Sequence, residues 1–459
     1  MTNIPPPSPE EALAEGEVQE RRDALRRMVQ EAFAAEDLST LRLILNDYHP
    51  ADLADLFRHL DDEEQPVALQ ALAEPLAAAV LAEMDADVLR EVAEDLPADD
   101  LSGLVDEMAP DDAADVLGDL SEEQSAEVLD LLEGEEAGQV RELLAHPEDT
   151  AGGLMTSRFI AVTEDMSAAQ AIEQVRAWAE DEDEVFYLYL IDQEGLLIGL
   201  VPLKRLLLAS ADAPVGTLAN RSPIAVRSDM DQEEIAYIFA EYDLLVLPVV
   251  DDIGRLVGVV TVDDIFDVLE EETTEDIYEM AAISSEERTD RPAAGVVRLR
   301  LPWLLVCLGG TLLAGAVIKG FDDTLSKVLA LSFFVPAVMA MGGNTGIQTA
   351  TVTVRSLAIG QGQWGLVGRE LRVALGLGSI LGVLAWGVAS WWTGDALLGG
   401  CVGLAMGAAV VLAAMMGAVV PLVFRRIGVD PAVASGPLIT TLNDGLSLLL
   451  YFGIAAFFL

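Results

Sequence analysis

The stretch PAVASGPLITTLNDGLSLLLYFGIAAFFL, residues 431–459, decides the fold of the C-terminal part of this chain. It holds one charged residue, Asp444, near the middle of 29 residues that are otherwise suited to lie in lipid as a helix. A carboxylate inside a membrane costs roughly 2.5–3.5 kcal/mol on insertion scales, so it is retained where protein or water surrounds it, and it normally marks a transport route. The stretch therefore predicts a membrane helix that offers a carboxylate to a moving cation.

Four further uncharged runs precede this stretch. Each reaches the length of about 18–20 residues that crosses a hydrocarbon core as a helix, so five spans are expected in all. The second run is long enough to include a short broken or re-entrant piece after its span, which is tolerated where backbone lines a cavity. The four runs are residues 301–318, 328–354, 373–393 and 396–424.

Basic residues near the ends of the spans predict the orientation. Arginines gather in the loops on one side of the membrane, and two lysines lie on the other side, which places the N-terminus in the cytoplasm and the C-terminus outside. The arginines are Arg298, Arg300, Arg355, Arg369, Arg372, Arg425 and Arg426, and the lysines are Lys319 and Lys327. Residues 1–20 are rich in Pro and Glu without an apolar core, so a disordered lead over residues 1–23 is expected rather than a signal peptide.

The formal net charge of −52 is concentrated before the membrane spans. The first 300 residues carry 72 acids and 19 bases, a charge that repels nucleic acid and anionic lipid and attracts cations. Salt adaptation, which makes every soluble surface acidic, is an equally simple explanation for the bulk of this charge. Both cysteines lie in apolar spans and the three histidines are scattered, so neither a disulfide framework nor a zinc site is expected. Oxygen ligands remain, and these favour Mg²⁺, Ca²⁺ or Mn²⁺.

Residues 37–144 show a repeated helical pattern. Acidic pairs 11–13 residues apart open successive short helices, as in LPADDLSGLVDEM followed by APDDAADVLGDL, which predicts an all-α helical superstructure. For any single pair, stabilisation of a helix N-terminus by the helix dipole is the simpler explanation. The pairs are Asp99/Asp100, Asp111/Asp112, Glu122/Glu123 and Glu135/Glu136.

Residues 150–272 contain an internal repeat of helix, strand, turn, strand and helix. FYLYLID and LLIGLVPL in the first copy correspond to LLVLPVVD and LVGVVTV in the second, and the arrangement resembles a tandem pair of CBS domains. Some CBS domains bind adenosine nucleotides through Thr or Ser followed three residues later by Asp, a pattern met here by Thr261 and Asp264. The first copy departs from it with Pro202 and Arg205. Since T-x-x-D also starts ordinary helices, nucleotide binding and helix capping both stay open.

Two membrane stretches carry a more specific resemblance. PAVMAMGGNTGIQTATVTVRSLAIG, residues 336–360, and DPAVASGPLITTLNDGLSLLLYF, residues 430–452, resemble the signature stretches of MgtE-type magnesium transporters, and HPEDTAGGLMT, residues 146–156, resembles that family's approach to its CBS pair. The resemblance implies a multidomain fold. Its parts are a disordered lead (1–23), a helical N domain (24–145), an α/β tandem CBS pair (146–272), a connecting or plug helix (273–299) and an α-helical pore domain with five transmembrane helices (300–459).

The family resemblance further implies a homodimeric, multi-pass Mg²⁺ channel of the cytoplasmic (inner) membrane, in contact with lipid and without enzymatic activity. Its pore candidates are Asp444, Asn344 and Thr345. Two copies of Asp444 would offer two charges to a hydrated dication without trapping it. The Gly-rich segment MGGNTG is expected to break the helix and free its carbonyls, although helix packing through small residues is the alternative. One departure is that Ser447 stands where the family often has Gly.

The resemblance also implies that cytoplasmic Mg²⁺ closes the channel by binding at acidic interfaces between the N domain, the CBS pair and the plug helix. ATP at the CBS domains belongs to the same implication, through Thr261 and Asp264. A merely solvated acidic surface is the alternative for each sensing residue. The candidates are Asp111, Asp115, Asp231, Glu233, Asp243, Asp264, Asp267, Glu272, Glu275, Asp276 and Asp430.

Other functions are compatible with parts of this pattern. A broader divalent channel for Mn²⁺ or Co²⁺ would use the same ligands, and a membrane sensor with CBS domains would need no transport. An anion channel is disfavoured because its path would require Arg, Lys or helix N-termini where this chain has Asp444. Measurements of ion flux distinguish all three.

Overall fold

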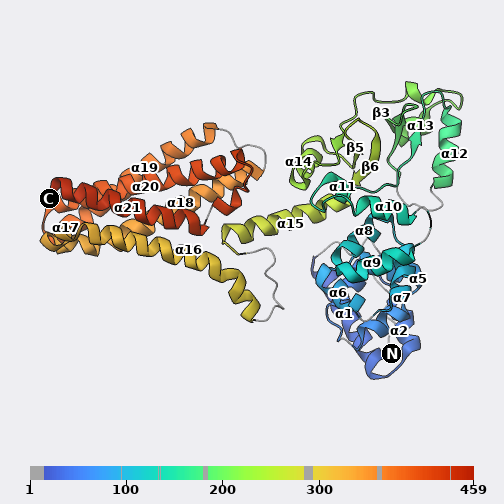
Figure 1. The fold of residues 1–459 in the computed structure, drawn as a ribbon, viewed down its shortest axis with the longest axis horizontal. Coiled ribbons are helices and arrows are strands. Elements are labelled where there is room, and N and C mark those ends of the chain that lie inside the picture. Colours follow the sequence, from blue (N-terminus) through green and yellow to red (C-terminus); the bar gives the residue numbers. More distant parts are fainter. Residues whose placement is uncertain are drawn as a thin grey trace. The chain divides into compact units, whose positions relative to one another are not determined.

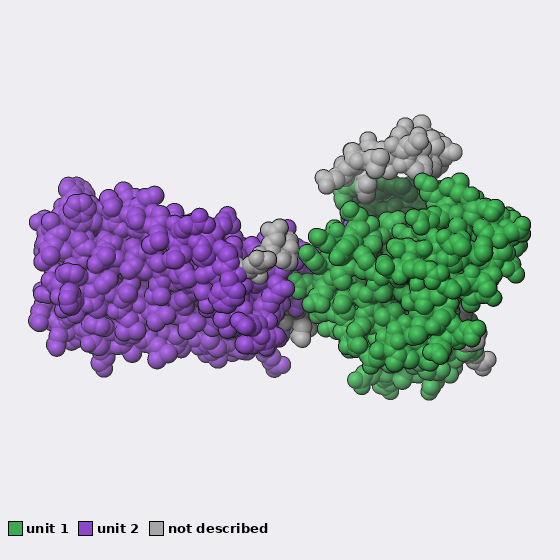
Figure 2. Space-filling model, turned by 90° about the horizontal axis from the view of Figure 1, so that it is seen from above, with its two compact units in different colours: residues 1–265 green, residues 266–459 purple. Residues whose placement is uncertain are grey.

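The computed structural model describes residues 15–61, 63–94, 96–132, 134, 136–178, 185–283, 293–358, 364–434 and 436–459. The chain divides into two compact units, residues 1–265 and residues 266–459, which Figure 2 distinguishes by colour. The first holds the helical module and the strand repeat, and the second holds the apolar helices (Figure 1).

The helical module of the first unit is a stack of short helices, as the acidic pairs predicted. The pairs at Asp99, Asp111 and Glu122 each lie in the first turn of a helix, while Glu135 lies outside the described residues. Leucine and phenylalanine side chains from several helices form its core. The helices are α1 (Glu15–Ala34), α2 (Leu38–Leu45), α3 (Pro50–Phe57), α4 (Gln65–Ala71), α5 (Glu74–Ala82), α6 (Ala86–Glu94), α7 (Ala98–Asp106), α8 (Pro110–Asp119), α9 (Glu122–Leu131) and α10 (Glu136–Leu143).

Helix α1 corrects the expected extent of the disordered lead. The lead was expected to reach residue 23, but α1 begins at Glu15. Its arginines pair with acids of α3, since Arg22 Nε lies 3.2 Å from Asp52 and Arg26 Nη2 lies 2.7 Å from Asp55. These partners lie about thirty residues further along the chain, so a local reading of composition could not anticipate them. Residues 1–14 lie outside the described residues.

The predicted strand repeat is confirmed as two three-stranded sheets with the same topology. In each sheet a short strand pairs in parallel with the first strand of an antiparallel hairpin, giving the orders β1-β2-β3 and β4-β5-β6. The strands are β1 (Ala161–Val162), β2 (Tyr187–Ile191), β3 (Leu197–Pro202), β4 (Val226–Arg227), β5 (Val246–Val250) and β6 (Leu256–Thr261). The accompanying helices are α11 (Ala151–Leu154), α12 (Ala168–Trp178), α13 (Leu203–Leu208), the 3₁₀ turn η1 (Val215–Thr217) and α14 (Gln232–Tyr242).

The second unit contains five helices long and apolar enough to cross a membrane, which confirms the five expected spans among the described residues. They are α16 (Ala293–Gly320), α18 (Val335–Ala358) with the preceding 3₁₀ turn η2 (Leu329–Phe333), α19 (Trp364–Thr393), α20 (Ala396–Arg426) and α21 (Gly436–Phe458). Shorter elements are α17 (Asp322–Lys327) and η3 (Ala432–Ala434). Helix α15 (Val262–Met280) starts directly after β6, in the first unit, and its later residues belong to the second.

The expected break at MGGNTG is wrong. Helix α18 continues through Gly342, Gly343 and Gly346, and the irregular turn η2 comes before the span instead of after it. In lipid an interrupted helix leaves backbone groups without partners, which favours continuity. The glycines serve close approach, since a Cβ on Gly346 would lie 2.9 Å from the side chain of Ile439 in α21. The alternative of helix packing through small residues therefore applies here.

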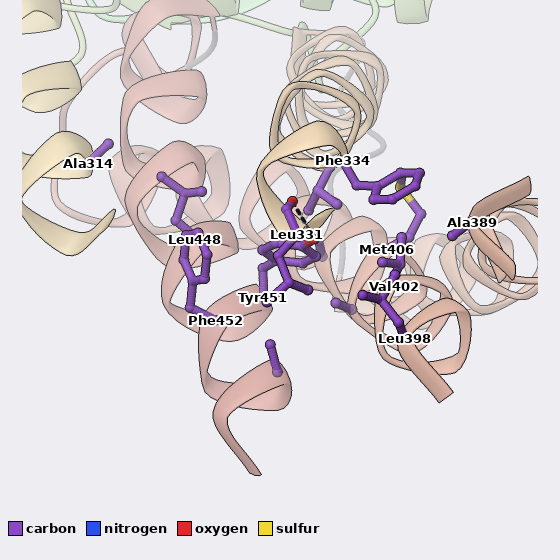
Figure 3. Close-up of a cluster of buried hydrophobic side chains, with 14 residues drawn as sticks. Ala314, Leu331, Phe334, Ala389, Leu398, Val402, Met406, Leu448, Tyr451 and Phe452 are labelled. Atoms are coloured by element: carbon purple, nitrogen blue, oxygen red, sulfur yellow. Dashed lines mark hydrogen bonds between the residues drawn. The ribbon is translucent and has the colours of Figure 1, made fainter. Parts of the chain in front are cut away.

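Helix α20 packs on α18, α19 and α21, while α16 packs chiefly on α21. A hydrophobic cluster, formed chiefly by α18, α20, α21 and η2 with Ala314 of α16 and Ala389 of α19, makes the core (Figure 3). Within it the hydroxyl of Tyr451 donates to the carbonyl oxygen of Leu331 over 2.8 Å, which ties α21 to η2. This bond holds the half of α21 that follows Asp444 in one place.

Candidate functional site

Asp444 lies in the third turn of α21 and its side chain is half-buried. It precedes the buried Leu448 by four residues and the buried Tyr451 by seven, so the three share one face of the helix. That face carries the residues that pack into the cluster of Figure 3. Asp444 is therefore turned toward the helix bundle, as a carboxylate retained in lipid must be.

The two other pore candidates point in different directions from α18. Asn344 is exposed, whereas Thr345 is buried and its hydroxyl donates to the carbonyl oxygen of Met341 over 2.7 Å. Because that bond occupies the hydroxyl hydrogen, Thr345 retains only lone pairs to offer a ligand. A single copy of the chain thus presents the Asn344 amide on its surface and keeps the Thr345 side chain inside.

Acidic residues of α8 and of the start of α15 come together within the first unit. Burial, followed by the charges of Asp111 and Asp264, raises the pKa of Asp115 to about 8. Burial also raises the pKa of Asp264 to about 7, with Asp263 and Asp111 adding to the effect and the hydrogen bond from Thr261 opposing it. We call Asp111, Asp112, Asp115, Asp263 and Asp264 the N-domain cluster.

Two members of the N-domain cluster, Asp112 and Asp263, were not among the expected sensing residues. Burial is the main cause that raises the pKa of Asp112 to about 6, and Asp111 and Asp263 contribute. Asp112 was read as the second half of a capping pair, and only the fold brings Asp263 close to it. The group repels itself as long as all its members are ionised.

Thr261 and Asp264 are bonded to each other. The Thr261 hydroxyl donates to Asp264 Oδ2 over 2.6 Å, and the Thr261 backbone N–H donates to the same oxygen over 3.4 Å. This is the capping arrangement of an ordinary helix start. Asp264 is thus both the partner of the residue that caps α15, Thr261, and a member of the N-domain cluster.

A second acidic group lies within the membrane-containing unit. Burial and the charges of Asp430 and Glu275 raise the pKa of Asp276 to about 6, against a lowering influence of Arg355. The pKa of Glu279 rises to about 7, through burial first and then through Asp430, Glu275 and Asp276. We call Glu275, Asp276, Glu279 and Asp430 the plug cluster. Glu279 was missed by the sequence analysis, although its spacing of three residues from Asp276 puts both on one helix face.

The remaining sensing candidates have local structural roles. Asp231 caps α14 by accepting the backbone N–H of Glu233 over 2.9 Å, and Asp243 ends that helix with a φ of 51°. Asp267 and Glu272 lie on α15, away from its capped start. The positions of Asp231 and Asp243 are explained by the ends of α14, whereas Asp267 and Glu272 have no capping role.

Among the described residues, no group of three or more His, Cys, Asp or Glu side chains is close enough to hold a bare metal ion. Mg²⁺ keeps most of its hydration shell in proteins and is bound by few direct carboxylates. The spread of the two clusters thus suits a hydrated ion.

Three family descriptions match successive parts of the chain. Residues 48–149 match the MgtE intracellular N domain, residues 151–212 and 215–271 match the CBS domain, and residues 335–454 match MgtE, described as a divalent cation transporter.

Curated relatives extend this similarity to nearly the whole chain. The magnesium transporter MgtE of Thermus thermophilus is 38% identical over 437 residues, covering 93% of this chain and 97% of the relative. The magnesium transporter MgtE of Bacillus subtilis is 38% identical over 318 residues, covering 68% and 70%. A crystal structure of the cytosolic domain of the Mg²⁺ channel MgtE in complex with ATP matches with a TM-score of 0.51 and 37% identity, over 53% of this chain and 99% of that one.

Proposed function

This chain belongs to the MgtE family of magnesium transporters, and on that premise we propose that Mg²⁺ passes its membrane unit beside Asp444 and closes the path again by binding the two acidic clusters. The chain is a multi-pass membrane protein and a transporter rather than an enzyme. The observation that carries the pore assignment is the half-buried Asp444, turned toward the helix bundle in an otherwise uncharged span.

The pore is proposed to form between two copies of the chain. The exposure of α16 supports a dimer. Ala314 is its one buried residue among those described, so its other faces are available to lipid or to a helix of the second copy. Asn344, exposed on α18, would face the ion in such a dimer, while Thr345 would support the helix from inside. Two Asp444 carboxylates would balance one dication, and water retained by the ion would bridge the remaining distance.

The gate is proposed to close when a bound cation removes the repulsion between the carboxylates of the two acidic clusters. Burial, followed by the charges of neighbouring carboxylates, raises the pKa values of Asp115 and Asp264 in the N-domain cluster to about 8 and about 7, and those of Asp276 and Glu279 in the plug cluster to about 6 and about 7. A divalent cation that neutralises such a cluster favours the conformation in which the carboxylates are close together. Cytoplasmic Mg²⁺ would thereby favour the closed state, with Asp231, Glu233, Asp243, Asp267 and Glu272 as further ligands on α14 and α15.

The Asp276–Asp430 relationship connects this gate to the pore. Asp430 precedes α21, the helix that carries Asp444, and the end of α15 approaches the start of α21 closely enough that a Cβ on Gly436 would collide with the carbonyl oxygen of Met280. A cation between Asp276 and Asp430 would hold α15 against the first turn of α21. We place the N-terminus in the cytoplasm on the arginine distribution, and the chain in the inner membrane.

ATP is proposed as a second ligand of the CBS pair, supported by the ATP complex of the related cytosolic domain. To bind a nucleotide, the Asp264 carboxylate would either release the Thr261 hydroxyl or accept a further hydrogen bond from the nucleotide beside it. Because Asp264 also belongs to the N-domain cluster, ATP and Mg²⁺ would affect each other's binding.

Transport is tested with the purified full-length chain in liposomes. We expect Mg²⁺ influx that falls as Mg²⁺ on the cytoplasmic side rises through the millimolar range, and protection from protease between residues 270 and 300 over the same range. Part of that segment, residues 284–292, lies outside the described residues. A folded protein that carries no divalent ion under any condition would leave the role of a CBS-bearing sensor.

A broader divalent cation channel is the second candidate, favoured by the family description that matches residues 335–454. Substituting Mn²⁺, Co²⁺ and Ca²⁺ for Mg²⁺ in the same liposomes separates the two. Comparable flux of Mn²⁺ or Co²⁺ would establish the broader function.

A further inference from the structure

Two fully buried polar residues adjoin Asp444 on α21. Asn443 and Ser447 both have an exposed fraction of 0%, and they lie one turn apart. The hydroxyl of Ser447 donates to Asn443 Oδ1 over 2.9 Å. The bond gives the Ser447 hydroxyl hydrogen an acceptor and the Asn443 oxygen a donor. Buried polar side chains in a membrane helix normally mark either helix association or function.

The side chains of Asn443 and Ser447 pack against a glycine of the neighbouring helix. A Cβ placed on Gly342 of α18 would lie 2.7 Å from Asn443 Nδ2, 3.2 Å from Asn443 Oδ1 and 3.2 Å from Ser447 Oγ. Only a residue without a side chain leaves room for both polar groups at this point. The contact therefore specifies which face of α21 meets α18.

One hydrogen-bonding group of the Asn443–Ser447 pair is left without a partner. Within the described residues, Asn443 Nδ2 has no hydrogen-bond partner. Leaving a buried donor unpaired is unfavourable. An apolar group of the same shape at residue 443 would remove that donor, and the Ser447 hydroxyl could then donate to the backbone carbonyl oxygen four residues earlier, as the Thr345 hydroxyl does to Met341. Packing stability alone therefore does not account for an asparagine here, and a role in function does.

We propose that Asn443 and Ser447 are positioning residues for the Asp444 carboxylate, an inference that rests on the proposed passage of Mg²⁺ beside Asp444. Successive residues of a helix are turned by about 100°, so seating Asn443 on Gly342 determines the direction of the Asp444 side chain. The bond between Ser447 and Asn443 keeps the amide in one rotamer and thereby prevents α21 from turning about its axis. Asp444 binds the ion, and the pair sets where its carboxylate stands.

The test compares Asn443→Leu, which keeps the shape of the side chain and removes its polarity, with Leu448→Ala as the matched control. Leu448 is also fully buried on α21 but carries no polar group. Asn443→Leu should raise the half-saturating Mg²⁺ concentration for influx at least tenfold while thermal stability stays equal or rises. Leu448→Ala should lower thermal stability and leave the half-saturating concentration within twofold.

A double-mutant cycle tests whether the two residues act together. Ser447→Ala should shift the half-saturating concentration in the same direction as Asn443→Leu, and the double variant should be no worse than Asn443→Leu alone. Additive effects, or a loss of transport that merely follows a loss of stability, would overturn the proposal.

A readout without transport separates this proposal from the proposed function. In a background with Cys307 and Cys401 replaced by Ala, Asp444→Cys is labelled by a charged thiol reagent with Asn443 either intact or changed to Leu. We expect the labelling rate to change at least fivefold. An unchanged rate would refute the positioning role even if the wild-type chain carried no ion, and absence of wild-type flux alone would refute the proposed function.

Discussion

Asp264 lies close enough to Asp115 for its charge to raise the pKa of that residue, although the two stand about 150 residues apart in the chain. Their proximity brings a helix of the N-terminal module against the start of α15. A contact of this kind is unfavourable when both carboxylates are ionised and becomes favourable when a proton or a cation lies between them.

The first prediction follows from this relationship and concerns stability without Mg²⁺. Because the folded-state pKa values of Asp115 and Asp264, about 8 and about 7, lie above the ordinary value of 3.8 for an aspartate, the folded chain holds protons that the unfolded chain releases. This stabilisation is complete below about pH 4 and is lost as pH rises through 7 to 8.

Melting temperature measured from pH 5 to pH 9 checks this. Without Mg²⁺ it should fall with rising pH by at least about 2–4 °C, the shift that about 1 kcal/mol produces in a unit of 150–250 residues. Added Mg²⁺ should restore it more at pH 9 than at pH 5. Asp115→Asn should flatten the profile, whereas Asp130→Asn, an exposed acid outside the cluster, should not. A Mg²⁺ effect equal at both pH values would contradict the prediction.

The second prediction concerns the pore carboxylate. Asp444→Ala removes the charge that faces the bundle, so Mg²⁺ influx should drop to the level of empty liposomes while the protein remains folded and of native size. Asp395→Ala is the control, because Asp395 caps α20 through the backbone N–H groups of Leu397 and Leu398. Influx near the wild-type rate in Asp444→Ala would remove this residue from the ion path.

Asn344 should govern preference among ions more than transport itself. Its exposed amide is a neutral ligand to a hydrated ion, so Asn344→Ala should change the ratio of Mg²⁺ to Co²⁺ influx at least threefold and keep measurable Mg²⁺ influx. The measurement is competition between the two ions in liposomes. A ratio equal to that of the wild type would assign Asn344 to some other role.

The plug cluster should set the response to cytoplasmic Mg²⁺. Replacing Asp276 and Glu279 by Asn and Gln removes the repulsion and the ligands together, and the loss of ligands weakens the coupling to Mg²⁺. The Mg²⁺ concentration that halves influx should rise at least fivefold. Glu270→Gln changes an exposed acid of the same helix and should have little effect. Unaltered inhibition of the double variant would mean that these acids are only solvated.

Two glycines of α19 offer a matched test of the membrane packing. A Cβ on Gly378 would lie 2.7 Å from the carbonyl oxygen of Gly407 in α20, whereas a Cβ on Gly376 would meet nothing within 4 Å. Gly378→Ala should therefore force α19 and α20 apart and lower the melting temperature by several degrees, while Gly376→Ala should leave it unchanged or slightly higher. Equal effects would contradict the close approach of the two helices.

The sequence predicted elements whose cause is local or periodic. The five spans, the two strand repeats and the acidic helix starts all follow from patterns within about thirty residues, and the structure has them. Asp444 could be singled out because one charge in an apolar stretch is visible without a fold.

Features that depend on distant partners could not be predicted in this way. Asp112 and Asp263 come together only because α8 packs near the start of α15. The glycines of MGGNTG suggested a broken helix, since a pattern cannot tell whether a glycine bends its own helix or admits a neighbour. Ser447 was visible as a departure from the family pattern, but its bond to Asn443 and their seat on Gly342 required coordinates.

The packing of α16 on α21 has a consequence for biosynthesis. These are the first and last of the five spans, so the first to leave the ribosome has its main intramolecular partner in the last. During translation α16 lies in lipid, with its long apolar surface uncovered, until α21 has been synthesised. Chains truncated before α21 should therefore remain open to quality-control proteases of the membrane, and the arrival of α21 decides whether α16 finds its partner.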